Sequence, residues 1–150
     1  MRALVRRVSR AEVKVSSKPV GIIGPGLLVY LGIHKKDEIS DLDWIIKKIL
    51  GLRVFNDEEG RMNLKIGADQ GILLVSQFTL WGNLKKGCRP SFNEAADGQT
   101  GEFFYHLALK ELKKHFTGDV KSGNFGADMQ IHAVDEGPVT IWIDSHNRDY

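Results

Sequence analysis

Apolar residues recur at every second position near the start of the chain, which is the spacing of a half-buried β-strand. The alternation covers residues 1–8 and 11–15, and two further apolar β segments lie on either side of a turn at residues 24–26. Apolar runs separated by glycine and proline are typical of strands joined by turns. The pattern therefore predicts a strand-rich N-terminal quarter.

Two later segments carry apolar residues at helical spacing. The first begins near Ser40, a residue type that caps helix N-termini, and ends near Gly51. Its apolar stripe consists of Leu42, Ile45, Ile46 and Ile49. The second stripe, which has a lysine-rich end, consists of Tyr105, Ala108, Leu109, Leu112 and Phe116. Two main helices are therefore expected.

The remaining apolar runs predict further strands. Residues 71–82 are apolar almost throughout, as in a strand covered on both faces. Residues 129–134 and 139–144 alternate as two more strands. The order of strands, strand–helix pairs and strands indicates one α/β domain, residues 1–150, with sheets covered by the two helices. A purely helical fold is excluded.

Length and composition favour a cytoplasmic protein. A chain of 150 residues that is 42% hydrophobic is long enough to bury a core. The single Cys88 cannot form an internal disulfide, and no apolar run is long enough to cross a bilayer. Because the first ten residues lack the apolar core of a signal peptide, we expect no export and no membrane partner.

Basic residues are concentrated at the N-terminus although the net charge is only +2. In the first eighteen residues Glu12 alone opposes Arg2, Arg6, Arg7, Arg10, Lys14 and Lys18. This imbalance is compatible with an acidic partner such as nucleic acid. Solvated charges on the outer face of a strand are the more frequent explanation of such a run.

The histidines form no recognisable metal motif. The five histidines are His34, His106, His115, His132 and His146. None of them has zinc-type spacing to Cys88 or to a carboxylate, so no metal is expected. Positive neighbours at Lys85, Lys86 and Arg89 favour a Cys88 thiolate. No histidine lies near Cys88 in sequence to act as its base, so an incidental surface cysteine is the simpler interpretation.

Polar residues interrupt the apolar segment 71–82 close together. Ser76, Gln77 and Thr79 lie among leucine, isoleucine, valine and phenylalanine. A buried polar group without a partner costs about 1–3 kcal/mol. These side chains therefore either satisfy nearby backbone groups or line a pocket at the end of a strand.

A Gly-Pro pair, Gly137-Pro138, separates the last two predicted strands. Tight hairpins prefer Asn-Gly or Asp-Gly, whereas proline fixes φ and donates no hydrogen bond. The pair is therefore either a plain chain reversal or a piece of functional backbone.

Five strings together resemble the D-aminoacyl-tRNA deacylase family over essentially the whole chain. They are RVFNDEEGRMN (53–63), SQFTL (76–80), KKGCRPSF (85–92), GNFGADM (123–129) and GPVT (137–140). The resemblance implies hydrolysis of the ester of D-aminoacyl-tRNA, and of glycine mischarged on alanine tRNA, without a cofactor. It also implies a homodimer with two active sites at the interface. Each site is made of the Ser-Gln-Phe-Thr segment of one subunit and the Gly-Pro pair of the other. The resemblance implies that this Gly-Pro peptide bond is cis and that the pair rejects L-amino acids.

The resemblance also assigns roles to individual residues. Ser76 and Gln77 position the adenosine or aminoacyl group, Phe78 packs at the pocket, and Phe125 and Met129 wall it. Lys85, Lys86 and Arg89 are expected to contact tRNA phosphates. Thr79 is the obvious nucleophile, but no base lies near it in sequence. We therefore expect Thr79 to contribute its backbone, while the 2′-hydroxyl of the tRNA helps to activate water and backbone amides stabilise the oxyanion.

The chain departs from the family pattern before its Gly-Pro pair. Asp135-Glu136 stand where many members have Asn-Asp, which removes any contact made by that asparagine. Two other functions fit parts of the sequence. One is a tRNA-binding module without catalysis, supported by the basic residues. The other is a hydrolase that uses Cys88 on a small ester or amide.

Overall fold

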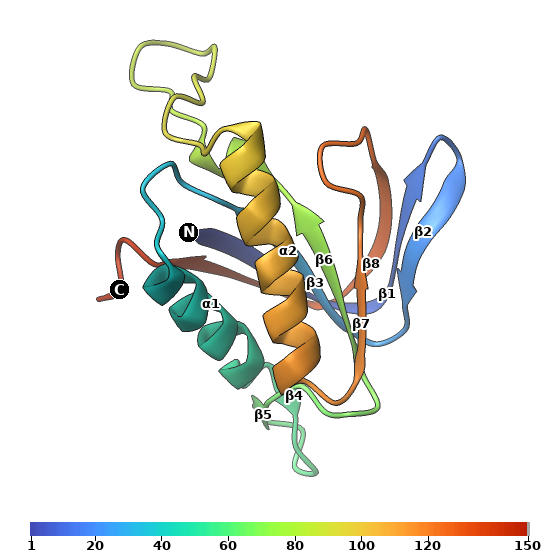
Figure 1. The fold of residues 1–150 in the computed structure, drawn as a ribbon. Coiled ribbons are helices and arrows are strands. Elements are labelled where there is room, and N and C mark those ends of the chain that lie inside the picture. The colour runs from blue at the N-terminus through green and yellow to red at the C-terminus, as the bar shows by residue number, and fades with distance from the viewer. Residues whose placement is uncertain (150) are drawn as a thin grey trace.

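The fold is a mixed β-sheet with two long helices, seen in a computed structural model that describes residues 1–149 (Figure 1). In chain order the elements are β1 (Arg2–Val15), β2 (Lys18–Ile23), β3 (Gly26–Gly32), α1 (Ile39–Gly51), β4 (Phe55–Asn56), β5 (Met62–Leu64), β6 (Gly71–Ser76), the 3₁₀ helix η1 (Phe78–Trp81), α2 (Gly98–His115), β7 (Asp119–Ser122) and β8 (Gln130–Asp144). The predicted α/β domain with two main helices is confirmed, and its main sheet is mixed.

The main sheet combines antiparallel and parallel pairing. Its order is β2-β1-β3-β6-β7, and β8 pairs with β1 outside this path, while β4 and β5 form a separate hairpin. β1 is antiparallel to β2, β3 and β8, whereas β3, β6 and β7 are mutually parallel. The chain passes through α1 between β3 and β6, and through α2 between β6 and β7. The carboxyl ends of these three parallel strands consequently meet at one edge of the sheet.

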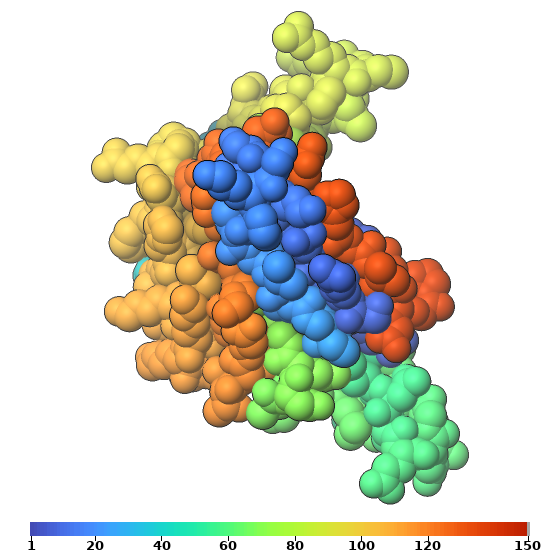
Figure 2. All heavy atoms as spheres, turned by 90° about the vertical axis from the view of Figure 1, so that its right-hand side faces the viewer, coloured from blue at the N-terminus to red at the C-terminus, as the bar shows by residue number. Residues whose placement is uncertain are grey.

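Apolar side chains fill both faces of the sheet. On one face, α1 and α2 pack over Leu27, Val29 and Leu31 (Figure 1). On the other face, Leu28 and Leu73 lie in a second cluster with residues of β1 and β2. Figure 2 shows this side of the molecule, where β1 and β2 lie beside β8. Residues 71–75 of β6 are buried, as predicted for a strand covered on both faces.

Three element boundaries differ from those expected. Residues 2–15 form one continuous strand rather than two. The apolar segment 71–82 is not one strand, because β6 ends at Ser76 and the chain turns into η1. Helix α1 begins at Ile39 rather than after Ser40, since the Asp41 carboxylate accepts a hydrogen bond from the Glu38 N–H at 3.1 Å. The capping box of Glu38 and Asp41, rather than Ser40, therefore sets the start of this helix.

The Gly137-Pro138 pair lies within one strand, so its interpretation as a chain reversal is wrong. Both halves of β8 run antiparallel to β1, with Val8 opposite Asp135 and Arg6 opposite Thr140. Residues 136–139 consequently bulge out opposite Arg7 alone. The peptide bond is cis, and Gly137 has a φ of 119°, a value that favours glycine.

No helix within residues 1–149 is long and apolar enough to span a bilayer.

Candidate active site

The carboxyl ends of β3 and β6 open into two adjoining cavities of about 280 and 250 Å³. Ligands of parallel α/β sheets commonly bind at this edge. Five residues line both cavities: Ser76, Gln77, Phe78, Phe125 and Gly126. The first cavity extends over Met129 and Ile131, and the second reaches Leu31 and the start of α2. The structure thus brings together the two sequence segments, 76–78 and 125–129, that were expected to form a pocket.

Strand β6 ends beside the pocket, where the next residue still bonds to β3 and the chain then turns into η1. The Gln77 N–H donates to the Leu31 carbonyl at 2.8 Å, and the Leu80 N–H donates back to the Gln77 carbonyl at 3.2 Å. A Cβ on Gly32 would lie only 2.8 Å from the Gln77 carbonyl oxygen, so glycine is needed there. This close approach seats η1 directly on the end of β3.

The far wall of the pocket is anchored by a buried tyrosine. The Tyr105 hydroxyl of α2 lies 2.9 Å from the Leu74 carbonyl oxygen and 3.1 Å from that of Gly123. The Tyr105 ring also contacts the Phe125 ring, with centroids 5.6 Å apart. Burial raises the pKa of Tyr105 to about 12. One side chain therefore joins α2 to the two chain segments that lead into the pocket.

The Thr79 side chain lacks the surroundings of an activated nucleophile. Its hydroxyl accepts a 2.5 Å hydrogen bond from the Gln77 side-chain nitrogen, and Thr79 is exposed and lines neither cavity. Asp97, the carboxylate in the second cavity, caps α2 by accepting from the Thr100 N–H at 2.8 Å. That hydrogen bond holds the pKa of Asp97 below its usual range. Neither residue forms the nucleophile–base pair that covalent catalysis requires.

Gly137 and Pro138 line neither cavity of their own chain. Both residues are exposed on the bulge of β8. Arg7 holds this bulge, because its Nε donates to the Glu136 carbonyl at 3.0 Å and its Nη1 donates to the Val54 carbonyl at 2.5 Å. The Gly-Pro backbone is therefore held in place and accessible to another molecule.

Lys85, Lys86, Cys88 and Arg89 are exposed on a segment that projects from the body of the protein (Figures 1 and 2). A bridge between Asn83 and Ser91 closes the base of this segment. Next to it the Phe92 ring contacts the Phe78 ring, with centroids 5.0 Å apart. The basic segment consequently begins at the rim of the pocket.

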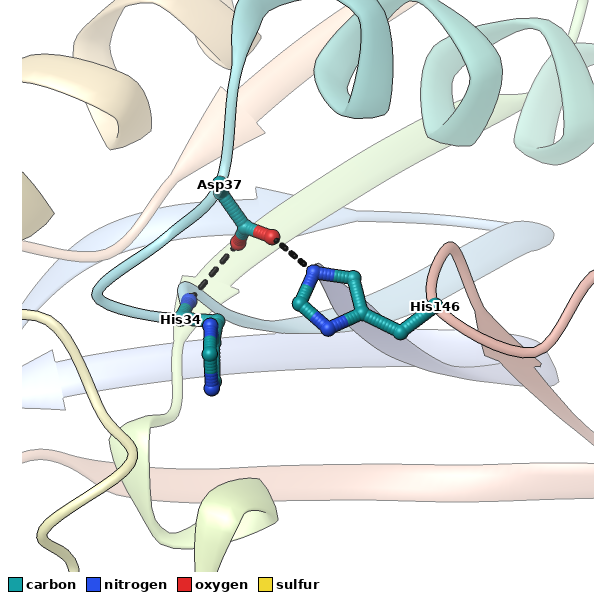
Figure 3. Close-up of side chains that lie close together, drawn as sticks. All are labelled: His34, Asp37 and His146. Carbon is teal, nitrogen blue, oxygen red and sulfur yellow. Dashed lines mark hydrogen bonds and ion pairs between the residues drawn. The ribbon is translucent and has the colours of Figure 1, made fainter.

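The fold brings together a polar cluster that the sequence pattern did not reveal (Figure 3). His34, Asp37 and His146 place ligand-type atoms within 4.8 Å of one another, contrary to the expectation that no histidine groups with a carboxylate. Asp37 accepts from the His34 N–H at 2.7 Å and contacts His146 Nε2 at 2.8 Å. His34 Nδ1 accepts from the Lys36 N–H, and its Nε2 contacts Glu94. These contacts use both ring nitrogens of His34 within a hydrogen-bond network.

Contacts of the C-terminal segment extend this cluster. The Met1 amine contacts both Asp37 and the Ser145 hydroxyl at 2.5 Å. Arg148 bonds to Asp41 at 3.0 Å. Burial lowers the pKa of the Met1 amine, while Asp37 opposes that effect. Residues 145–148 therefore close the fold against the loop after β3.

Fold and pocket together define a single-domain α/β protein with cavities at the carboxyl edge of its parallel strands. Known proteins are similar to this chain in sequence and in fold. A curated D-aminoacyl-tRNA deacylase of Thermotoga petrophila is 47% identical over 97% of each chain. A solved structure titled c-Myc DNA Unwinding Element Binding Protein is 42% identical, with a TM-score of 0.90 over 96% of this chain and 98% of the other.

A more distant solved structure is titled as a probable eukaryotic D-amino acid tRNA deacylase. It shares the fold, with a TM-score of 0.79 over 95% of this chain and 97% of the other, and is 19% identical in sequence. The family model described as D-Tyr-tRNA(Tyr) deacylase matches residues 4–144. The chain therefore belongs to the D-Tyr-tRNA(Tyr) deacylase family. The family assignment made from the sequence, and with it the class of deacylase enzyme, is confirmed.

Proposed function

We propose that the chain hydrolyses the ester bond of D-aminoacyl-tRNA in the cytoplasm and releases free D-amino acid and tRNA. Glycine mischarged on alanine tRNA is a second substrate, because it has no side chain to be rejected. The observation that carries the proposal is the joined cavity lined by Ser76, Gln77, Phe78, Phe125 and Met129 in a chain of this family.

The two cavities suit the two ends of the scissile ester. Their combined size is that of a small-molecule site. The second cavity is mainly apolar, whereas polar and apolar atoms line the first almost equally. One compartment takes the aminoacyl group and the other takes the terminal adenosine. Ser76 and Gln77 lie where the compartments join and orient the ester, while Phe78 and Phe125 pack against the flat or apolar parts of the substrate.

The chemical step depends on orientation rather than on a protein nucleophile. Water attacks the ester carbonyl carbon with help from the 2′-hydroxyl of the terminal adenosine. The bond from that carbon to the 3′ oxygen breaks, and the 3′ oxygen takes a proton. Amide hydrogens in the first turn of a helix have no acceptor within the helix, so those at the start of η1 are available to the developing oxyanion. Thr79 supplies such an amide and not its hydroxyl.

Selection against L-amino acids comes from the second subunit of a homodimer. Gly137 and Pro138 of the partner subunit enter the pocket, where their main-chain atoms leave space for a hydrogen or a D side chain only. The exposed bulge of β8, held by Arg7, supports this role, as does its absence from the cavity of its own chain. A steric clash separates enantiomers more sharply than an added attractive contact.

The experiment is a paired assay of D- and L-aminoacyl-tRNA that carry the same side chain. We expect release of the D-amino acid at a rate about 100-fold or more above that of the L-amino acid, because rejection is steric. Phe78→Ala should lower the rate, whereas His106→Ala, an exposed α2 variant, should not. A rate ratio near one contradicts selection by handedness.

A nucleic-acid-binding module without catalysis is the second candidate function. The 42% identical relative whose title names a DNA-binding protein favours it, as does the exposed basic segment around Lys85, Lys86 and Arg89. The same assay separates the two candidates. Binding of tRNA without release of either enantiomer supports the module and excludes the deacylase.

A further inference from the structure

We propose that Arg2 is a positioning residue for the reaction, because it holds η1, which directly follows the pocket residue Gln77 and begins at the pocket residue Phe78. This inference rests on the proposed location of the site at residues 76–79. Arg2 lines neither cavity, so it acts through Leu80 and Trp81 and does not touch the substrate.

Arg2 contacts the end of η1 in two ways. Its Nη1 donates to the Leu80 carbonyl at 2.9 Å, and its guanidinium carbon lies 3.8 Å from the centroid of the Trp81 ring. On its other side, Nε donates to the Asp144 carboxylate at 2.8 Å. The planar guanidinium joins three partners in one fixed geometry, which a lysine ammonium does not reproduce.

The neighbouring backbone explains why this contact fixes η1. Arg2 lies opposite Gly32 in the pairing of β1 with β3. The Trp81 indole nitrogen donates to the Gly32 carbonyl at 3.1 Å, and a Cβ on Gly32 would meet Leu80 at 3.0 Å. A 3₁₀ turn has poorer internal hydrogen bonds than an α-helix, so a short one depends on outside contacts. Arg2 and Gly32 supply those contacts from adjacent strands.

The Asp144 carboxylate makes it possible to separate the effect of Arg2 on the position of η1 from its effect on the stability of the fold. Asp144 is 6% exposed and also accepts from the His146 N–H at 2.9 Å. Arg2→Ala leaves a buried negative charge without its arginine, which destabilises the fold. Adding Asp144→Asn removes that charge and keeps an oxygen for His146. The double variant therefore recovers stability but still lacks the contact with Leu80.

The test measures kcat, KM and Tm for Arg2→Ala, Asp144→Asn and the double variant on a D-aminoacyl-tRNA. We expect kcat to fall about 10-fold or more in both variants that lack Arg2, since η1 is no longer held within the productive geometry. KM should change less than about 3-fold because Arg2 does not contact the substrate. Asp144→Asn keeps the Arg2 contact with Leu80 but turns an amide NH2 towards Arg2 Nε, so it should lose less kcat than Arg2→Ala. Lys113→Ala, an exposed α2 variant, serves as the matched control.

Three outcomes overturn the proposal. Recovery of both Tm and kcat in the double variant assigns Arg2 a structural role only. A loss of kcat in Asp144→Asn equal to that in Arg2→Ala does the same. A rise in KM that disappears at low salt makes Arg2 a phosphate contact. An inactive wild-type protein contradicts the proposed function instead, and unchanged activity of Phe78→Ala contradicts the proposed site.

Discussion

The Tyr105 hydroxyl of α2 lies 2.9 Å from the carbonyl oxygen of Leu74 in β6. Leu74 also accepts from the Gly123 N–H at 2.9 Å, and Gly123 follows β7. The Tyr105 hydroxyl is therefore hydrogen-bonded at the point where β6 and the segment after β7, which both lead into the pocket, lie side by side. Tyr105 is 1% exposed, so this contact is shielded from water.

Alkaline pH should weaken the protein through Tyr105. Burial raises the pKa of Tyr105 to about 12 from its ordinary value of 10.0. At a pH between these two pKa values, the folded state keeps the Tyr105 proton that the unfolded state releases. The stabilisation is fully present below pH 10 and is lost as pH rises towards 12, an effect of about 2–3 kcal/mol. Tyr105→Phe should remove this dependence and cost about 1–2 kcal/mol at pH 7.

Urea unfolding at pH 8 and pH 11 measures this effect as the difference in free energy of unfolding between wild type and Tyr105→Phe. The difference should shrink at the higher pH. Tyr30→Phe controls for the loss of a tyrosine hydroxyl elsewhere in the sheet. A difference that is constant with pH would show that the Tyr105 hydroxyl titrates alike in the folded and unfolded states.

Thr79→Ala should retain activity within about tenfold of wild type, because no step is assigned to its hydroxyl. The hydroxyl accepts from Gln77, so its loss frees one donor at the pocket rim and has a modest effect on orientation. Single-turnover deacylation of D-aminoacyl-tRNA is the measurement, with Thr79→Val as a variant of matched shape. A loss beyond a thousandfold with intact folding would assign the side chain a covalent or base role.

Gly137→Ala should abolish activity in the homodimer while the pocket residues stay intact. A Cβ at this position would lie 2.8 Å from the Arg7 guanidinium, and the φ of 119° disfavours alanine. The bulge would then be displaced from the position in the partner pocket that the proposed function requires. D-aminoacyl-tRNA turnover and oligomeric state are measured together.

Subunit mixing tests whether the Gly-Pro pair acts across the interface. Gly137→Ala and Phe78→Ala should each be much less active than wild type when tested alone. After equal amounts are unfolded and refolded together, random pairing regenerates about a quarter of the wild-type sites, each with an intact pocket and an intact partner loop. Absence of any recovery in a preparation shown to contain mixed dimers would place the pair and the pocket in the same chain.

Local patterns predicted much of the fold. The stripe Leu42, Ile45, Ile46 and Ile49 is buried as its spacing indicates, and the apolar residues 71–75 form a central strand. The boundaries that differed depend on contacts beyond the local pattern. At Gln77 the N–H still bonds to Leu31 of another strand, and the chain then turns as the Leu80 N–H donates to the Gln77 carbonyl. No periodicity within segment 71–82 indicates these partners.

The site was predictable only in part for the same reason. The polar residues Ser76 and Gln77 within an apolar run left two possibilities open, bonds to nearby backbone groups or a pocket at the end of a strand, and the structure has a cavity there. The cluster of His34, Asp37 and His146 joins residues far apart in the chain, and spacing rules for metal or catalytic motifs apply only to residues close in sequence. Arg2 likewise meets Leu80 and Asp144 through strand pairing that the sequence does not specify.

The basic segment at the pocket rim should set the salt dependence of tRNA binding. Lys85, Lys86 and Arg89 are exposed, and each phosphate contact contributes about 0.7–0.9 to the slope of log affinity against log salt concentration. The triple alanine variant should therefore weaken binding and lower that slope by about 2–3. Its kcat at saturating substrate should stay near wild type, because these side chains do not line the cavities. Titrations at several salt concentrations, with Lys113→Ala as a control for the loss of surface charge, measure the slope; an unchanged slope would move the tRNA path to another face.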